Sequence, residues 1–213
     1  TPKFSLRSSQ ITPSRNLVSI TEGSCGYGLP LLEGIFLSLS ACGRIAIIGD
    51  NGSGKSTLVK AILNEATVIK SGNWIVPQPE DIGYLDQHYA TLASNKTVFE
   101  ELQTLVPSWS QGEIRRHLND FLFRKNEEVL ALVSTLSGGE KARLSLAKIA
   151  AKTPKLLILD EVTNNLDLET RAHVIQILAL YPGALIVISH DEAFLNEIGI
   201  KDFYELKSRK ETR

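Results

Sequence analysis

The sequence contains no methionine and only two cysteines, Cys25 and Cys42. Because an intact gene product normally begins with methionine, a chain that begins Thr1-Pro2-Lys3 is expected to be a piece of a longer protein. The small number of cysteines and the lack of a signal peptide favour a reducing, cytoplasmic setting.

Long apolar runs and a strong charge bias are also missing. No run approaches the roughly 18 apolar residues of a membrane helix, so direct membrane insertion is not expected. The net charge is -1, and any contact with nucleic acid would therefore need a local basic patch. What remains is the composition of a folded globular domain, with 43% hydrophobic and 22% charged residues among 213.

The order of the apolar patterns predicts an α/β fold. Three short apolar runs lack the alternation of half-exposed strands, which is typical of strands buried in a parallel sheet. These runs are residues 44–48, 155–159 and 184–188. Segments with helical periodicity alternate with these runs. The predicted helices are residues 55–63, 140–151 and 168–181.

The domain organisation follows from the same patterns. Residues 1–16 are polar and lack periodicity, as expected of a linker or an edge strand. Residues 17–213 form the predicted domain. Within it, residues 98–132 are mostly helical (98–105 and 111–122), which predicts a small helical subdomain.

The segment from Gly49 to Thr57 matches the phosphate-loop pattern G-x-x-x-x-G-K-[ST], between a predicted strand and a predicted helix. Glycines let the backbone wrap closely round phosphate groups, and the helix N-terminus favours their negative charge. Lys55 can reach the β- and γ-phosphates of ATP, and the Ser56 hydroxyl can coordinate Mg²⁺. The predicted nucleotide-binding residues are Gly49, Asn51, Gly52, Ser53, Gly54, Lys55, Ser56 and Thr57.

Two carboxylates, Asp160 and Glu161, end the second apolar run, at the edge where ligands bind in open α/β sheets. Side chains at successive positions point in opposite directions, which suits a division of labour. Asp160 would act on Mg²⁺ through its water shell, and Glu161 would polarise the attacking water. Because a strand followed by an acidic helix cap looks the same, this hypothesis depends on the phosphate loop.

The histidines divide into one candidate and three others. His190 follows the third apolar run at the same edge, where a neutral imidazole can donate to the γ-phosphate or orient the water. Without the other motifs it would be interpreted as structural. His88, His117 and His173 are interpreted as surface or packing residues.

A second candidate phosphate site is Leu136-Ser137-Gly138-Gly139-Glu140, which precedes a predicted helix. Ser137 can cap this helix, and the two glycines leave its first N–H groups open to an anion. The run resembles the LSGGE signature of ABC ATPases, and the other motifs occur in that family's order. The resemblance covers residues 17–206. It implies a P-loop NTPase fold of the ABC type with a mainly parallel core sheet. It also implies that the domain hydrolyses ATP with Mg²⁺.

The resemblance also assigns residues that no pattern identifies alone. Gln87 resembles the family's Q-loop glutamine, which contacts magnesium and the attacking water, and His190 resembles its switch histidine. Asp167 ends a run, 164–167, that resembles the D-loop. Tyr27 lies at the family's spacing for the aromatic residue that stacks on adenine, although a tyrosine between two glycines also fits a turn.

Members of this family pair head to tail, which implies a second ABC domain as the partner, in the same parent chain or in a homodimer. The signature of one domain, here Ser137, Gly138 and Gly139, then covers the ATP on the phosphate loop of the other. One domain therefore carries two half-sites.

Residues 136–144 and 160–167 resemble the ABC-F branch, whose members are soluble tandem-domain ATPases that in many cases act on ribosomes. Val162 and Asn165 depart from the branch pattern, which has proline and histidine there, so the resemblance does not fix the shape of this turn or the turnover rate. The short span between Gln87 and Leu136 also suits ABC-F, which needs no large helical surface to bind a transmembrane partner, and the chain resembles the second of two tandem domains. The ribosome or ribosomal RNA is therefore an expected partner.

Two alternatives and one weak signal accompany this interpretation. The same chemistry fits the ATP-hydrolysing subunit of an ABC membrane transporter. The head of a chromosome-maintenance ATPase is disfavoured, because no heptad pattern of a long coiled coil interrupts the chain. Basic side chains could contact RNA phosphates, although solvated helix faces explain them equally well. They are Arg115, Arg116, Arg124, Lys125, Lys207, Arg209 and Lys210.

Overall fold

The computed structural model describes residues 16–86, 88–89, 92–93, 95–163 and 166–206, and the chain divides into two compact units. We call them the sheet unit and the helical unit. The described residues of the sheet unit are 16–84, 154–161 and 182–206; those of the helical unit lie within 85–153 and 162–181.

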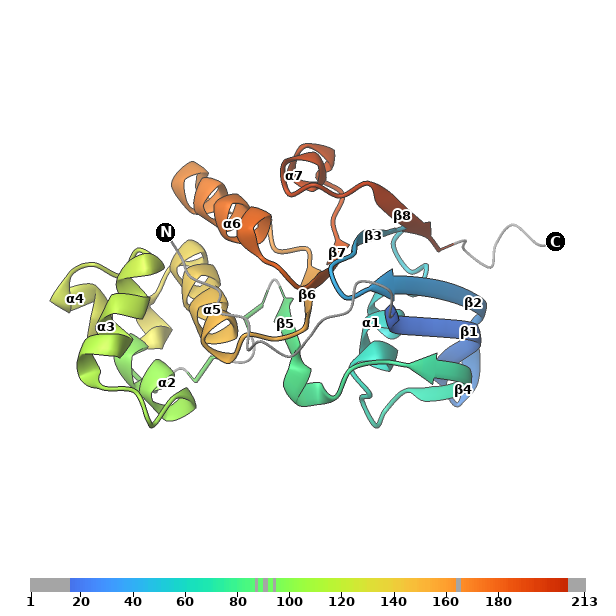
Figure 1. Cartoon of the computed structure of the whole chain (residues 1–213), viewed down its shortest axis with the longest axis horizontal. Helices are drawn as coiled ribbons and strands as arrows, with labels where there is room; N and C mark the ends of the chain where they lie inside the picture. The colour runs from blue at the N-terminus through green and yellow to red at the C-terminus, as the bar shows by residue number, and fades with distance from the viewer. Residues whose placement is uncertain (1–15, 87, 90–91, 94, 164–165, 207–213) are drawn as a thin grey trace. The chain divides into compact units, whose positions relative to one another are not determined.

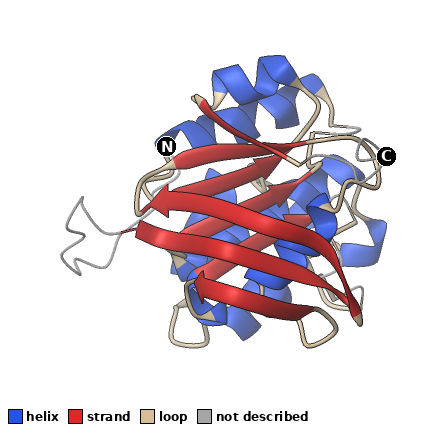
Figure 2. Ribbon diagram, turned by 90° about the vertical axis from the view of Figure 1, so that its right-hand side faces the viewer, coloured by secondary structure: helices blue, strands red, loops and turns tan. Residues whose placement is uncertain are grey.

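The sheet unit contains a three-stranded antiparallel sheet in the order β2-β1-β4, whose long strands face the viewer in Figure 2. β1 (Asn16–Tyr27) forms a hairpin with β2 (Leu29–Ser40), and β4 (Ile69–Ile75) pairs on its other side. Register shifts interrupt the pairing of β1 with both neighbours. The sequence does not reveal this sheet, because the shifts and the Gly and Ser residues of β1 break the regular alternation of a strand.

A five-stranded sheet has the order β5-β6-β7-β3-β8 (Figure 1). β3 (Arg44–Ile48) pairs parallel with β7 (Ala184–Ile188) and β8 (Asp202–Glu205), and β6 (Leu156–Asp160) pairs parallel with β7. The three strands predicted from apolar runs are therefore confirmed, with β6 displaced by one residue. β5 (Ile82–Asp86) and β8 are additional edge strands that the sequence does not reveal.

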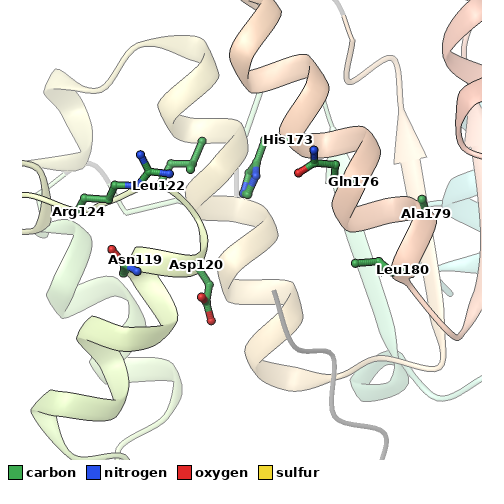
Figure 3. A pocket seen from close by; sticks show the side chains of 8 residues that line it. All are labelled: Asn119, Asp120, Leu122, Arg124, His173, Gln176, Ala179 and Leu180. Carbon is green, nitrogen blue, oxygen red and sulfur yellow. The ribbon is translucent and has the colours of Figure 1, made fainter. Parts of the chain in front are cut away.

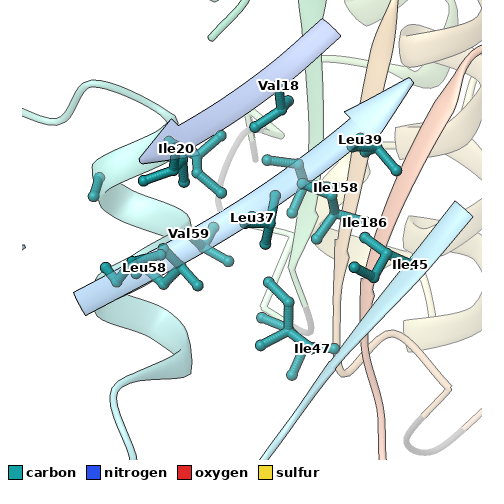
Figure 4. Close-up of a cluster of buried hydrophobic side chains, with 14 of the residues drawn as sticks. Val18, Ile20, Leu37, Leu39, Ile45, Ile47, Leu58, Val59, Ile158 and Ile186 are labelled. Carbon is teal, nitrogen blue, oxygen red and sulfur yellow. The ribbon is translucent and has the colours of Figure 1, made fainter. Parts of the chain in front are cut away.

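One hydrophobic core joins both sheets to α1 (Lys55–Ile62), which follows the phosphate loop (Figure 4). The antiparallel sheet contributes Val18, Ile20, Leu37 and Leu39, α1 contributes Leu58 and Val59, and the parallel strands contribute Ile45, Ile47, Ile158 and Ile186. Burial of these apolar side chains is the main stabilising term. The core therefore fixes the strand before the phosphate loop and the helix after it. A 3-10 turn (Pro79–Asp81) precedes β5, and a short α7 (Glu192–Glu197) follows β7.

The helical unit consists of α2 (Val98–Leu105), α3 (Gln111–Asp120), α4 (Asn126–Val129), α5 (Gly138–Lys152) and α6 (Leu168–Leu180). A 3-10 turn (Val133–Thr135) lies before the signature run. The five helices predicted from the sequence correspond to α1, α2, α3, α5 and α6, and their ends differ from the predicted ends by at most two residues. None of the helices in the described ranges is long and apolar enough to cross a membrane.

Capping explains where several of these helices begin. Thr97, Ser110 and Ser137 each precede a helix, and each forms a reciprocal capping box with the glutamate three residues later. α3 ends at Asp120, earlier than the predicted end at residue 122, because Leu122 has a left-handed backbone (φ +68°) that cannot continue a helix.

The core of the sheet unit predicts different effects for two isoleucines. Ile158 on β6 is fully buried, whereas Ile69 on β4 is 62% exposed. We expect Ile158→Ala to lower the free energy of unfolding by about 2–5 kcal/mol, because it leaves a cavity. Ile69→Ala, the control, should cost less than about 1 kcal/mol. Urea unfolding of the 213-residue chain measures both, and equal losses would contradict the described core.

Candidate nucleotide-binding site

Three predicted motifs lie at one edge of the five-stranded sheet because their strands run parallel. In the strand register, Asp160 at the end of β6 pairs with Ile188 at the end of β7, and Ile188 pairs with Ile47 near the end of β3. The phosphate loop, the acidic pair and His190 follow directly after these positions. The structure therefore brings together residues that are far apart in the sequence.

Close packing explains two glycines of the phosphate loop. A Cβ on Gly49 would lie 2.7 Å from the Ser53 hydroxyl oxygen and 2.8 Å from the backbone oxygen of Leu206. A Cβ on Gly54, whose φ is +101°, would lie 2.9 Å from the Leu32 side chain of β2. Both positions combine a positive φ with a close contact, so the loop keeps this shape only with glycine.

Lys55 and Ser53 are the less exposed polar side chains of the loop, whereas Asp50 and Asn51 are exposed. Lys55 Nζ donates hydrogen bonds to the backbone oxygens of Gly49 (2.5 Å) and Asp50 (3.0 Å), so the ammonium group lies across the loop. The Ser53 hydroxyl oxygen is buried and has no hydrogen-bond partner among the described residues. A glycine cradle with a cation and an unpaired buried hydroxyl fits a phosphate group. Ser56 is exposed, and Thr57 is buried at the start of α1.

Glu161 and His190 meet at the carboxyl edge. His190 Nε2 lies 3.4 Å from Glu161 Oε1, and the two side chains are 62% and 21% exposed, respectively. The backbone N–H of Glu161 donates to the Ile188 oxygen at 2.9 Å. Glu161 has a left-handed backbone (φ +53°), which is uncommon for a residue with a side chain and stores strain. Asp160, one position earlier, accepts a hydrogen bond from the Tyr84 hydroxyl.

The signature lies at the start of α5 in the helical unit. Ser137 caps the helix, as predicted, by accepting from the Glu140 N–H (3.3 Å) while Glu140 Oε2 accepts from the Ser137 N–H (2.8 Å). The two glycines differ in their surroundings. Gly138 is exposed, and a Cβ there would meet no described atom within 4 Å. Gly139 is buried, and its Cβ would lie 2.8 Å from Asp167 Oδ2 and 3.0 Å from Thr170 Oγ1.

Asp167 caps α6 and packs against the signature. Its Oδ1 accepts from the Thr170 N–H (2.9 Å), and its Oδ2 accepts from the Thr170 hydroxyl (2.8 Å). These two hydrogen bonds lower the pKa of Asp167, so the carboxyl group stays ionised near neutral pH. The contact between this cap and Gly139 is not visible in the sequence, because the two motifs belong to separate helices.

Three other predictions have different outcomes. Gln87 and Asn165 lie outside the described residues. Tyr27 ends β1 and is 51% exposed, and Gly28 (φ +80°) follows it at the hairpin turn. Val162, which occupies the usual proline position, is buried. Sequence reasoning missed two contacts: that of Leu32, on a strand without a recognisable motif, and that of Tyr84, three residues before the predicted Q-loop glutamine.

A cavity of about 650 Å³ lies in the helical unit, between the α3–α4 connection and α6 (Figure 3). Its lining residues are Asn119, Asp120, Leu122, Arg124, His173, Gln176, Ala179 and Leu180, none of which is a predicted nucleotide-binding, catalytic or magnesium residue. His173 is buried, burial lowers its pKa, and its ring packs edge-on against Phe121 (6.2 Å between centroids). His117 packs against the rings of Trp109 and Phe121. Both histidines are packing residues, as predicted.

Comparison with known protein sequences agrees with these motifs. The model of the ABC transporter family matches residues 32–164. The probable ATP-binding protein YheS of Haemophilus influenzae is 38% identical over 97% of this chain, and the putative ATP-binding protein YdiF of Bacillus subtilis is 40% identical over 81%. The chain covers 33% and 26% of these two relatives, a third of their length or less.

Solved structures share the fold. CbiO1 from Clostridium perfringens, part of an ABC transporter complex, has a TM-score of 0.73 at 22% identity, covering 90% of this chain and 85% of that one. The ATP-binding cassette MJ0796, solved as a dimer with ADP and Pi, has a TM-score of 0.72 at 20% identity, covering 89% and 94%. Since the family model also covers more than half of the chain, the chain belongs to the ABC family of ATP-binding proteins and resembles its ABC-F branch.

Proposed function

We propose that this chain is one of two ABC domains that pair head to tail in an ABC-F protein, hydrolyse Mg-ATP between them and act on the ribosome. The observation that carries the ATPase proposal is the glycine cradle of the phosphate loop. It holds Lys55 and the unpaired Ser53 hydroxyl at the sheet edge where Glu161 and His190 meet. Membership of the ABC family supports the same activity.

In this proposal the loop residues bind the phosphates of ATP. Lys55 exchanges its two backbone acceptors for β- and γ-phosphate oxygens, which offer it full negative charge. Backbone N–H groups of the loop and the start of α1 donate to the remaining phosphate oxygens. Tyr27, exposed at the hairpin turn, would stack on the adenine.

Mg²⁺ would be held by Ser56 and, through water, by Asp160, with Gln87 as a further contact. The described residues contain no cluster of three His, Cys, Asp or Glu side chains arranged for a metal. The few protein ligands proposed here, Ser56, Asp160 and Gln87, suit magnesium, which takes most of its ligands from phosphate oxygens and water. When bound, the ion neutralises phosphate charge as the terminal phosphate is transferred.

For hydrolysis, Glu161 would accept a proton from the attacking water, and His190 would orient that water or the γ-phosphate. The 3.4 Å approach of His190 Nε2 to Glu161 Oε1 supports a shared task for the two side chains. The strained backbone of Glu161 also supports a catalytic role, because such strain occurs most often at functional positions.

Pairing is supported by the different surroundings of the signature glycines. The space beside the Gly138 α-carbon is open, as expected of a backbone that another molecule approaches. The corresponding space at Gly139 is filled by the side chains of Asp167 and Thr170 of the same domain. The signature residues Ser137, Gly138 and Gly139 would therefore cover the ATP of the partner domain. Asp167 would support the signature by packing against Gly139. The parent chain would contain two ABC domains. This chain would be the second of them, and the first would be its partner.

The ribosomal role rests on the likeness to ABC-F proteins and on the lengths of the relatives. YheS and YdiF are three to four times as long as their matched segments, which leaves room for a second ABC domain. A ribosomal partner would place the protein in the cytoplasm. Among the basic residues, Arg115 is already engaged by Asn126 (2.6 Å) and the Phe99 ring, so it is a weak candidate for RNA contact.

The assigned roles predict two distinct defects in the parent protein, one in ATP binding and one in turnover. Lys55→Ala should weaken ATP binding roughly 10- to 100-fold, because a charged contact with phosphate is lost. Glu161→Gln should bind ATP about as tightly as the unchanged protein but turn over on the order of 100-fold more slowly. Fluorescent ATP-analogue binding and steady-state phosphate release measure these values. Unchanged turnover in Glu161→Gln would refute the assigned base.

The two signature glycines should separate packing from function. We expect Gly139→Ala to lower the free energy of unfolding by about 1–3 kcal/mol, because its Cβ collides with the Asp167 cap. Gly138→Ala should change stability by less than about 0.5 kcal/mol and yet reduce ATP turnover of the parent protein. Urea unfolding and phosphate release test both. Full turnover in Gly138→Ala would argue against a signature that approaches the partner's nucleotide.

Ribosome binding should depend on ATP. We expect the parent protein with Glu161→Gln to co-sediment with ribosomes when ATP is present and to stay in the supernatant without it. Lys55→Ala serves as the control for non-specific adhesion and should not pellet under either condition. If Glu161→Gln retains ATP but never pellets, the ATPase proposal survives and the ribosomal proposal fails, which would favour a membrane-transporter subunit.

A further inference from the structure

Tyr84 contacts the acidic pair from a neighbouring strand. It lies on β5, which is next to β6 in the sheet, and its hydroxyl donates to Asp160 Oδ2 at 3.3 Å. Both residues belong to the sheet unit. Tyr84 lies in the run 83–87 that resembles the Q-loop, but the resemblance assigns a role only to Gln87 of that run.

The ring of Tyr84 is anchored independently of Asp160. It is partly buried and packs against the hydrophobic core that joins the two sheets and α1. Packing limits the rotamers of the ring, so the core restricts where its hydroxyl can lie. The same core holds α1, whose first turn carries Ser56, so Ser56 and Asp160, two of the three predicted magnesium contacts, lie on elements with one support.

We infer that Tyr84 is a positioning residue, which orients the Asp160 carboxylate for the magnesium ion of the ATP site. The inference rests on the proposed function, in which Asp160 acts on that ion. A hydroxyl that donates to Oδ2 restricts rotation of the carboxylate. Tyr84 does not itself contact substrate in this scheme. It acts through Asp160, and it should therefore affect metal binding more than ATP binding or the chemical step.

The test compares Tyr84→Phe with Tyr204→Phe in the parent protein. Tyr204 lies on β8, packs against the same core, and interacts through its hydroxyl with the backbone of Phe36. Each substitution removes one hydroxyl and keeps the ring. Binding of Mn²⁺, a spectroscopic substitute for magnesium, is titrated by electron paramagnetic resonance with a non-hydrolysable ATP analogue present. The affinity for the analogue alone is measured in EDTA.

For Tyr84→Phe we expect the half-saturating Mn²⁺ concentration to rise roughly three- to tenfold, the effect of one modest hydrogen bond. Analogue affinity in EDTA should stay within about twofold, and saturating Mg²⁺ should restore turnover. Tyr204→Phe should titrate like the unchanged protein. An equal rise in both variants would show a general packing effect and overturn the inference.

Asp160→Asn separates this inference from the proposed function. If Asp160→Asn weakens Mn²⁺ binding and Tyr84→Phe does not, the positioning role is wrong and the magnesium assignment of Asp160 stands. If Asp160→Asn also titrates like the unchanged protein, the assignment of Asp160 fails, and the role of Tyr84 fails with it.

Discussion

Parallel pairing of β3, β6 and β7 is the constraint on which the rest of the candidate site depends. Strands that run in one direction end at one edge, so the segments that follow them must meet there. Ile47, Ile158 and Ile186 are all fully buried. The register of the strands therefore cannot slip without exposing core side chains. The phosphate loop, Glu161 and His190 thereby come to one edge of the sheet although they are far apart in the sequence.

Backbone conformation limits the amino acids at several points of this edge. Gly49 and Gly54 combine positive φ values with contacts that leave no room for a Cβ, which keeps the phosphate loop closely wrapped. Glu161 accepts the same kind of strain while keeping its side chain, at the position to which we assign the general base. In the helical unit, Gly139 is required by the cap of α6, whereas Gly138 is open. A glycine can thus indicate internal packing or an approach by another molecule.

The sequence predicted the elements whose signals are local and continuous. β3, β6 and β7 are unbroken apolar runs, and α2, α3 and α5 begin at capping residues followed three positions later by glutamate. The antiparallel sheet was missed because its pairing is non-local and its register shifts disturb the alternation of side chains. The contacts of Tyr84 with Asp160 and of Asp167 with Gly139 were missed because they join segments that only the folded chain brings together.

The central claim is that one domain carries two half-sites, a phosphate loop in the sheet unit and a signature in the helical unit, each completed by a partner domain. A cryo-EM structure of the Glu161→Gln parent protein with Mg-ATP tests this claim most directly. We predict that each γ-phosphate lies between Lys55, or its counterpart, in one domain and Ser137, or its counterpart, in the other. ATP bound on the phosphate loop with no signature facing it under saturating nucleotide would contradict the claim.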